Sequence, residues 1–249
     1  MGLAAAGRCF SLKYEEIRRF TIQFQGGEIM NRTRIKICGL TRREDVQTAV
    51  DAGADALGFV FYPASPRYVS AHKASELMTE IPPFVTSVGL FVNADIDEVT
   101  AVVETTHLSL LQFHGDESPE WCAEAAAATN RPFIRVFRVK PDTTADDLLQ
   151  YERIYRNASP YFKGLLLDTW TDAYGGAGKV FNWSLVSKEI GPRVVLSGGL
   201  SAQNVAGAVS ELRPFAVDVS SGVEAAKGIK DAEKIRAFIR AVRQAGEPI

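Results

Sequence analysis

Four side chains that can exchange protons stand at or just after the ends of apolar segments in this chain. Cys38 and Asp168 each close such a segment, His114 lies two residues beyond another, and Asp218 lies one residue before the end of a fourth. A thiolate can take a proton from carbon, and a carboxylic acid can donate one to a leaving oxygen. We therefore predict acid–base chemistry with Cys38 as general base and Asp168 as general acid, and with His114 and Asp218 as substrate-binding residues.

The alternation of side chains along a strand places the first of these groups beside a cation. Lys36 and Cys38 lie two residues apart and share one face of their segment, whereas the isoleucines between and before them share the other. The pattern Thr41-x-x-Glu44 is typical of a capping box, so a helix is expected to begin at Thr41. We expect that helix and Lys36 to favour the thiolate form of Cys38.

Three glycine-rich segments follow the last three apolar segments of the chain. Glycine lets the backbone approach an anion closely, and unpaired N–H groups bind an anion without a net positive protein. The pattern predicts a phosphate site after the seventh and eighth segments and a flexible lid after the sixth. The phosphate-binding residues are Ser197, Gly198, Gly199, Ser220, Ser221 and Gly222, and the lid glycines are Gly175, Gly176 and Gly178.

Each proposed functional residue also has an ordinary structural explanation. A lone cysteine is most often a small buried hydrophobe, so Cys38 alone would indicate no chemistry. Asp168 could cap a turn, His114 could stabilise the turn at the following glycine, and Asp218 could order the loop after it. These separate roles would not require the four residues to share one end of a fold, and this convergence favours the catalytic interpretation of Cys38 and Asp168.

From Arg34 onward, eight β-branched or apolar segments alternate with eight amphipathic ones, which predicts parallel strands connected by helices. The cap Ser118 before Pro119 marks one helix start. The predicted strands are Arg34–Cys38, Ala56–Phe61, Ser87–Val92, Leu108–Gln112, Phe133–Val139, Gly164–Asp168, Arg193–Ser197 and Phe215–Val219. The predicted helices are Arg42–Ala52, Ser70–Ile81, Ile96–Thr105, Ser118–Ala128, Thr144–Arg156, Trp183–Glu189, Asn204–Glu211 and Asp231–Gln244.

We predict a single (β/α)8 TIM barrel over residues 33–249, because a chain of 249 residues has the usual length of one such barrel. The alternative is an open doubly wound sheet, which usually has about five or six strands and a glycine-rich turn after the first. Only Gly39 follows the first segment here. Residues 1–32 are expected to form an N-terminal extension that is either disordered or a translated leader, with Met30 as the natural start.

The composition excludes several classes of function. The chain has 46% apolar and 23% charged residues and a net charge of −2, which gives no general attraction to nucleic acid or an anionic membrane. No apolar run approaches the roughly 20 residues that cross a bilayer. Three cysteines without a CxxC pair fit neither a disulfide framework nor a zinc site. We expect a cytoplasmic monomer or homodimer that binds a small phosphorylated substrate without a metal or other cofactor.

Ten motifs occur in a characteristic order from about Arg34 to the C-terminus. They are Lys36–Thr41, Asp51–Pro63, Ser65–Tyr68, Gly89–Asn93, Leu111–Glu117, Leu167–Thr169, Gly175–Lys179, Phe181–Trp183, Leu196–Leu200 and Pro214–Glu224. Together they closely resemble the phosphoribosylanthranilate isomerase family.

This resemblance implies an enzyme of tryptophan biosynthesis that performs an Amadori rearrangement. The substrate would be N-(5-phosphoribosyl)anthranilate and the product 1-(2-carboxyphenylamino)-1-deoxyribulose 5-phosphate. The resemblance assigns the general base to the cysteine of the KICG motif, Cys38, and the general acid to the aspartate of the LLDT motif, Asp168. It also implies that the arginine of the S-x-R-Y segment, Arg67, lies near the carboxylate of the anthranilate.

The sequence departs from the family pattern at three positions. Ala177 stands where Ser or Thr is common, Asn182 stands where Asp is usual, and Lys227 stands where a Pro-Gly is usual. None of them is the proposed acid or base, so they bear on turnover more than on the type of reaction.

Two other functions fit part of the pattern. Another phosphosugar barrel, either a ring-closing synthase or an aminoaldose isomerase with two aspartates, would share the phosphate loops. A cysteine that ends the first strand, opposite an aspartate that ends the sixth, argues against it. A non-catalytic barrel that binds a phosphate ligand would keep the glycine loops, but it would need neither Cys38 nor Asp168.

Overall fold

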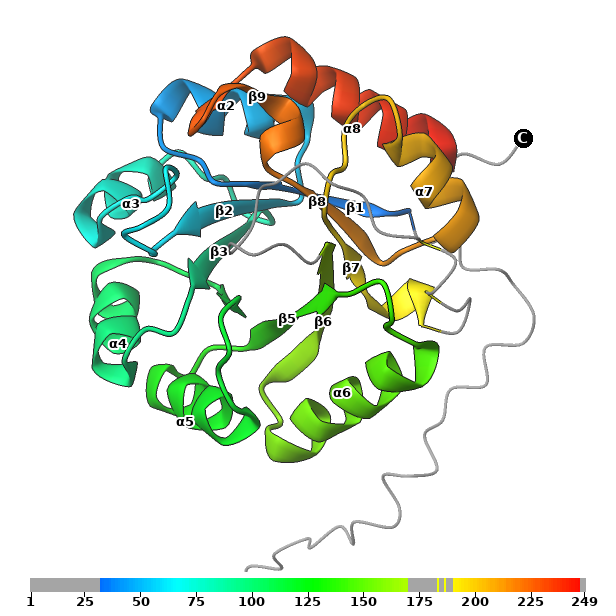
Figure 1. The fold of residues 1–249 in the computed structure, drawn as a ribbon. Coiled ribbons are helices and arrows are strands. Elements are labelled where there is room, and N and C mark those ends of the chain that lie inside the picture. Colours follow the sequence, from blue (N-terminus) through cyan, green and yellow to red (C-terminus); the bar gives the residue numbers. More distant parts are fainter. Residues whose placement is uncertain (1–31, 170–182, 184–185, 187–189, 247–249) are drawn as a thin grey trace, which may run out of the picture. The chain divides into compact units, whose positions relative to one another are not determined.

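The structure is a computed structural model that describes residues 32–169, 183, 186 and 190–246. Eight strands close into one barrel in the order β1 to β8 (Figure 1). All neighbouring strands in the barrel are parallel, and β8 pairs with β1. The predicted (β/α)8 barrel is therefore confirmed. An open sheet is excluded, because the first and last strands of an open sheet would be unpaired edges, whereas β1 and β8 pair with each other here.

The eight strands lie close to the segments that the sequence predicts. The shortest one, β7, covers two residues instead of the predicted five, and the first predicted residue, Arg193, belongs to a turn of 3-10 helix at Gly191–Arg193. The strands are β1 (Arg34–Cys38), β2 (Ala56–Val60), β3 (Thr86–Phe91), β4 (Leu110–Phe113), β5 (Phe133–Val139), β6 (Phe162–Thr169), β7 (Val195–Leu196) and β8 (Ala216–Val219).

Helices cover the outside of the barrel (Figure 1). They are α2 (Arg43–Ala52), α3 (Ala71–Met78), α4 (Ile96–Thr105), α5 (Pro119–Thr129), α6 (Ala145–Ala158), α7 (Val205–Leu212) and α8 (Ala232–Gly246). The helix predicted over residues 183–189 falls mostly outside the described residues, as do the whole predicted lid and residues 1–31.

Two predicted helix starts have different outcomes. Ser118 caps α5 as predicted, because its Oγ accepts the N–H of Trp121 at 3.2 Å and a proline takes the first helical position. The predicted capping box at Thr41 is wrong: α2 begins at Arg43, and the Thr41 hydroxyl donates to the Gly228 carbonyl at 2.6 Å. The Thr41 hydroxyl therefore binds a carbonyl that is distant in the sequence, instead of capping the helix as the local pattern predicts.

Apolar side chains fill both the space between strands and helices and the inside of the barrel. Ile35 and Ile37 belong to the large outer core, as the alternation along β1 predicts. Ile134, Val136 and Leu166 form a smaller cluster on the opposite face of β5 and β6, inside the barrel. The barrel is thus a packed core rather than a pore, and only its rim is available for chemistry.

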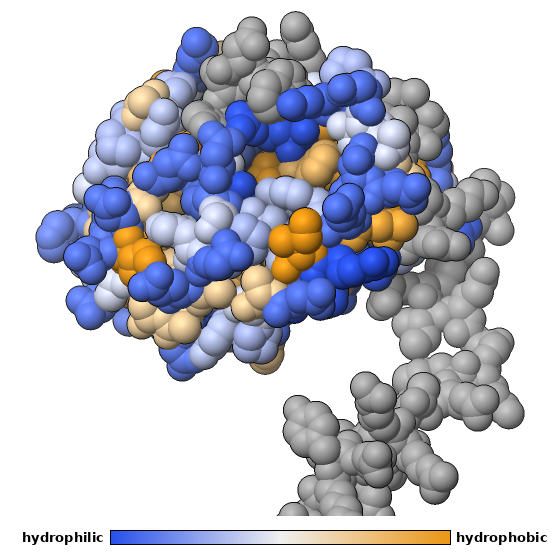
Figure 2. All heavy atoms as spheres, turned by 60° about the horizontal axis from the view of Figure 1, so that its bottom comes forward, coloured by the Kyte–Doolittle hydropathy of each residue, from blue (hydrophilic) through white to orange (hydrophobic). Residues whose placement is uncertain are grey.

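The surface in Figure 2 is mostly hydrophilic, with scattered apolar patches. Among the described residues, the exposed large apolar side chains come from five different places in the chain: Tyr68, Phe84, Ile154, Phe215 and Ile229. None of the described helices is long and apolar enough to cross a membrane.

A small antiparallel hairpin follows the barrel strands, and the sequence pattern does not predict it. A short 3-10 helix at Ser221–Val223 leads from β8 into β9 (Glu224–Ala226), which pairs with β10 (Ile229–Lys230) before α8 begins. Figure 1 shows β9 beside α2, at the edge of the barrel mouth. The hairpin therefore brings additional side chains to the rim that β1 and β8 form.

Candidate active site

The four predicted proton-exchanging groups lie at one rim of the barrel. Cys38 is the last residue of β1, Asp168 and Asp218 are each the last residue but one of β6 and β8, and His114 directly follows β4. Because all the strands are parallel, these positions meet at the C-terminal end of the barrel, where the active sites of such barrels lie. All four side chains are buried.

Cys38 lies in an apolar pocket next to a buried cation. Its side chain packs with Val60, Leu90 and Val92. A Cβ added to Gly58 would lie 2.8 Å from Cys38 Sγ and 3.1 Å from Lys36 Nζ, so the thiol and the ammonium both occupy the space that this glycine leaves. Any larger residue at position 58 would displace the proposed base.

Burial raises the pKa of the Cys38 thiol, and the nearby Lys36 ammonium acts in the opposite direction without cancelling the effect. We expected the surroundings to favour the thiolate, and the structure corrects this expectation for the free enzyme. α2 begins at Arg43 and not at Thr41 as expected. Lys36 and, to a smaller extent, Lys230 are the cations that lower the Cys38 pKa and so favour the thiolate.

Lys36 is fixed by Asp218. Lys36 Nζ lies 2.8 Å from Asp218 Oδ1, and both side chains are nearly inaccessible to solvent. Burial disfavours the ammonium, but the charge of Asp218 and the neighbouring Cys38 outweigh it and raise the pKa of Lys36. Ser197 Oγ donates to the second carboxylate oxygen of Asp218 at 3.2 Å. Asp218 thus binds Lys36 directly, and Ser197 holds Asp218. Their predicted contacts with substrate and with phosphate stay predictions.

Asp168 lies on the other side of the mouth, beside His114. His114 Nε2 is 3.2 Å from Asp168 Oδ2, close enough for an ion pair when the ring is protonated but not aligned for a hydrogen bond. The amide nitrogen of Gln112 lies 3.3 Å from His114 Nδ1. The Gln112 amide therefore contacts the ring nitrogen of His114 opposite the one that lies beside Asp168. The sequence gives no signal for this use of Gln112 beyond its shared face with His114.

The residues predicted to bind phosphate lie in two loops that touch each other. A Cβ added to Gly222 would lie 1.9 Å from the Leu200 carbonyl, so the loop after β8 packs directly against the loop after β7. Gly198 has a φ of +83°, and a Cβ there would lie 3.0 Å from Asp168 Oδ1. Glycine is therefore required at both positions, and the first loop also contacts the proposed acid.

Arg67 is held by an acidic residue that we did not predict as part of the site. Its Nε and Nη2 lie 2.7 and 2.8 Å from the two carboxylate oxygens of Glu224, and both side chains are largely buried. Lys230 Nζ lies 3.0 Å from Glu224 Oε1 and also donates to the carbonyl of Ser220 at 3.1 Å. The hairpin thus links Arg67 to the loop after β8.

A second unpredicted network holds the loop that carries His114. Glu117 Oε1 accepts the N–H groups of Asn93 and Gly115, at 2.9 and 3.1 Å. Arg135 donates to the carbonyls of Phe113 and Gly115 and lies 3.2 Å from the second oxygen of Glu117. These contacts fix the backbone on both sides of His114.

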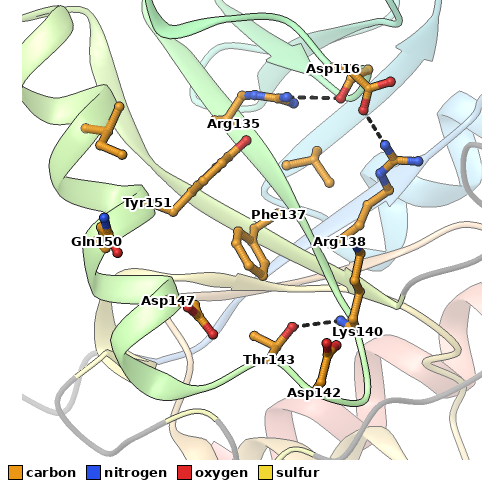
Figure 3. A pocket seen from close by; sticks show the side chains of 13 residues that line it. Asp116, Arg135, Phe137, Arg138, Lys140, Asp142, Thr143, Asp147, Gln150 and Tyr151 are labelled. Atoms are coloured by element: carbon orange, nitrogen blue, oxygen red, sulfur yellow. Dashed lines mark hydrogen bonds and ion pairs between the residues drawn. The ribbon is translucent and has the colours of Figure 1, made fainter.

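A cavity of about 440 Å³ lies outside this constellation (Figure 3). It opens between β5, α6 and the loop after β4, and Phe137 and Tyr151 meet edge to face in its wall. Arg138 pairs with Asp116 at one end of it. Neither Cys38 nor Asp168 lines this cavity, so it is not the place of the proposed proton transfers.

Comparison with known proteins gives this geometry a family. The model of the N-(5'-phosphoribosyl)anthranilate (PRA) isomerase family matches residues 35–241. An N-(5'-phosphoribosyl)anthranilate isomerase from Herminiimonas arsenicoxydans is 65% identical over 217 residues, which cover 87% of this chain and 96% of that protein. The enzyme of the same name from Ralstonia nicotianae is 52% identical over 225 residues, covering 87% and 95%.

The chain belongs to the phosphoribosylanthranilate isomerase family. It is an isomerase of tryptophan biosynthesis, as the sequence motifs predict. A crystal structure of phosphoribosylanthranilate isomerase from Thermotoga maritima is 43% identical, with a TM-score of 0.75, and covers 85% of this chain and 99% of that one. A second structure of the family is in complex with reduced 1-(o-carboxyphenylamino)-1-deoxyribulose 5-phosphate, and it is 40% identical with a TM-score of 0.72.

Of the three departures from the family pattern, one lies among the described residues. Lys227 is exposed in the turn between β9 and β10, whereas positions 177 and 182 lie outside the described residues. The turn around Lys227 keeps Gly228 at a φ of +78°, so the substitution does not prevent the hairpin from forming.

Proposed function

We propose that this chain converts N-(5-phosphoribosyl)anthranilate into 1-(2-carboxyphenylamino)-1-deoxyribulose 5-phosphate, with Cys38 as general base and Asp168 as general acid. One observation carries the proposal: a thiol and a carboxyl group end β1 and β6 at one rim, beside two touching glycine loops. An Amadori rearrangement needs these two groups within reach of adjacent sugar carbons.

The reaction begins with opening of the furanose ring. Asp168 donates its proton to the ring oxygen as the bond between C1 and that oxygen breaks, which leaves a protonated Schiff base on the anthranilate nitrogen. Cys38 then removes the proton from C2, and the electron pair forms the C1–C2 double bond of an enolamine. Transfer of a proton from the C2 hydroxyl to C1 gives the ketone. The cationic Schiff base and Lys36 both favour the thiolate at the step that needs it.

The ends of the substrate need separate sites to hold C1 and C2 between acid and base. The backbone N–H groups of the loops after β7 and β8 suit a phosphate, since both loops contain glycines that allow close approach. Arg67 supports binding of the carboxylate at the other end, because guanidinium and carboxylate can form two parallel hydrogen bonds.

The deciding experiment is an assay with freshly generated N-(5-phosphoribosyl)anthranilate that follows the loss of anthranilate fluorescence. We expect turnover by the wild-type chain. Binding of the substrate without turnover would favour a non-catalytic phosphate-binding barrel, and turnover only of a different phosphosugar would favour another barrel enzyme. Either outcome contradicts the proposal.

We also propose that the enzyme works in the cytoplasm as a monomer or homodimer. The proposed base is a free thiol, which suits a reducing compartment. A Thermotoga maritima relative is described as a dimeric phosphoribosylanthranilate isomerase from which monomers were generated. Sedimentation of this chain over a range of concentrations distinguishes the two states, and a larger assembly would contradict both.

A further inference from the structure

The β9–β10 hairpin buries two charged side chains, Glu224 and Lys230, which lie outside the eight barrel strands. The side chain of Lys230 is 0% exposed and that of Glu224 is 7% exposed. Burial of charges is costly unless each one is paired and hydrogen-bonded. We therefore ask which group the buried pair of Glu224 and Lys230 holds in place.

Glu224 holds one edge of the Arg67 guanidinium group. The two carboxylate oxygens take Nε and Nη2, which is the fork geometry of a bidentate pair. A guanidinium group has five N–H donors in one plane, so Nη1 and the second N–H of Nη2 point along the other edge. No described residue accepts a hydrogen bond from Nη1 of Arg67. That remaining edge again matches the two oxygens of a carboxylate.

Lys230 sets the charge of this cluster. Arg67 and Glu224 alone would be a neutral pair with little attraction for an anion. Lys230 adds a second cation at 3.0 Å from Glu224, so one carboxylate lies between two positive groups. Burial lowers the pKa of Lys230 and Glu224 opposes that effect; with Lys230 charged, the cluster carries a net charge of +1. Burial raises the pKa of Glu224, but the two cations outweigh it and lower that pKa below its usual value, so Glu224 stays ionised.

The hairpin is itself fixed to the loop after β1, to α2 and to the loop after β2. Its turn accepts the hydroxyl of Thr41, and the N–H of Lys230 donates to Asp45 Oδ2 at 3.1 Å. A Cβ added to Gly228 would lie 2.6 Å from the carbonyl of Pro66, the residue directly before Arg67. The hairpin therefore holds both the backbone that carries Arg67 and the guanidinium group at its end.

We propose that Glu224 is a positioning residue that fixes Arg67 so that its free edge binds the aromatic carboxylate of the substrate, while Lys230 keeps the cluster positive. The inference rests on the proposed function, because it assumes a ligand with that carboxylate. It assigns to the hairpin the recognition of one end of the ligand, and it leaves the acid–base step to Cys38 and Asp168.

The test uses two ligands that differ only in the carboxylate. One is reduced 1-(o-carboxyphenylamino)-1-deoxyribulose 5-phosphate, and the other has a phenyl group in place of the carboxyphenyl group. Titration calorimetry of the full chain measures the ratio of the two dissociation constants. We expect the wild type to prefer the carboxylated ligand by about tenfold or more, the usual range for a charge-assisted bidentate contact. Arg67→Ala should abolish this preference.

Glu224→Gln should also reduce the preference to within a factor of about three, because an amide cannot accept two hydrogen bonds from the fork. This variant also makes the cluster more positive. The double variant Glu224→Gln/Lys230→Met keeps the wild-type charge of +1 but lacks the clamp. It should lose the preference as well, and it should bind both ligands more weakly since Lys230 also holds Ser220. Glu152→Gln is the matched control. Glu152 is a buried acid on α6 that pairs with Arg156 and Arg193, and this variant should keep the wild-type preference.

The outcomes separate this inference from the proposed function. If Arg67→Ala loses the preference while Glu224→Gln and the double variant keep it, Glu224 is not a positioning residue and the inference is wrong. A preference that increases in Glu224→Gln would likewise overturn it, because charge alone would then govern binding. If the wild type shows no preference for the carboxylated ligand, the carboxylate contact of the proposed function is itself wrong.

Discussion

The two sides of the barrel mouth differ in how completely their polar groups are paired. On the side of β1 and β8, Lys36 is bound to Asp218, and Arg67 is bound to Glu224. These four side chains are largely buried and each has a charged partner within the protein, while Arg67 keeps one edge of its guanidinium group free of hydrogen bonds to the described residues. That side is a fixed arrangement of charge that exists before any ligand binds.

On the side of β4 and β6, buried polar atoms remain without hydrogen bonds to the described part of the chain. Among them are His114 Nε2, Gln112 Oε1, Thr169 Oγ1 and Glu117 Oε2, and the last of these is paired only through the charge of Arg135. An unmet buried polar atom costs stability, so its presence usually has a functional reason. The difference fits the two proposed groups: Lys36 and Asp218 set the charge around Cys38, whereas the polar atoms near Asp168 are left to bind the substrate.

The largest effect should come from removing the reacting group on either side. Cys38→Ser and Asp168→Asn should each lower kcat by about 10²- to 10⁴-fold, the usual contribution of a general acid or base. Binding of the reduced product analogue, measured by calorimetry, should change little. Near wild-type kcat in either variant would show that the role assigned to that residue is wrong. The description of the mouth as having a base side and an acid side would then be wrong as well.

The next largest effect should come from Lys36→Met on the paired side. Loss of the ammonium removes the influence that lowers the Cys38 pKa, so that pKa should rise further above its usual value. The acidic limb of the pH profile of kcat/KM should therefore move to higher pH. Alkylation by iodoacetamide should report the same shift in a Cys9→Ser background, since Cys122 is fully buried and burial raises its pKa to about 12.

This variant should also lose about 3–5 kcal/mol of stability, because Asp218 is left as an unpaired buried charge. The double variant Lys36→Met/Asp218→Asn separates the two effects. It should regain much of the stability in urea unfolding. Its alkylation profile should lie between those of the wild type and Lys36→Met, because the Asp218 carboxylate raises the Cys38 pKa but less strongly than Lys36 lowers it. A profile at the wild-type position would show that Lys36 does not set the pKa of the thiol.

The sequence predicts the elements better than the contacts between them. The strands follow from apolar alternation, and closure of the barrel follows from their number. The inward direction of Lys36 and Asp218 was also predictable, but their contact joins residues 182 positions apart and depends on the register between β1 and β8. Glu224 closes one of the family motifs, but its contact with Arg67 was not predictable because it lies in a hairpin without apolar alternation. Thr41 misled the helix prediction because its partner carbonyl lies 187 residues away.

A smaller effect is expected from Glu117→Gln on the less completely paired side. Glu117 holds the backbone of the loop that carries His114, and the change replaces a charged acceptor beside Arg135 by an amide. We expect a loss of about 1–3 kcal/mol of stability, as for other weakened buried hydrogen bonds. A several-fold lower kcat should accompany it because His114 loses its fixed place beside Asp168. Unchanged kcat with lowered stability would mean that the position of His114 does not matter for turnover.

The smallest effect is expected at the neighbouring residue, which makes it the control for Glu117. Ser118 caps α5 through its hydroxyl, which accepts the N–H of Trp121, so Ser118→Ala should cost about 1 kcal/mol of stability, the usual value of a lost N-cap. Ser118→Asp should restore it, since a carboxylate can accept the same N–H and interacts well with a helix start. Urea unfolding measures both changes, and kcat should stay at the wild-type value in both. A fall of kcat in Ser118→Ala as large as that in Glu117→Gln would show that general loosening of the loop, rather than the network around His114, lowers turnover on this side of the mouth.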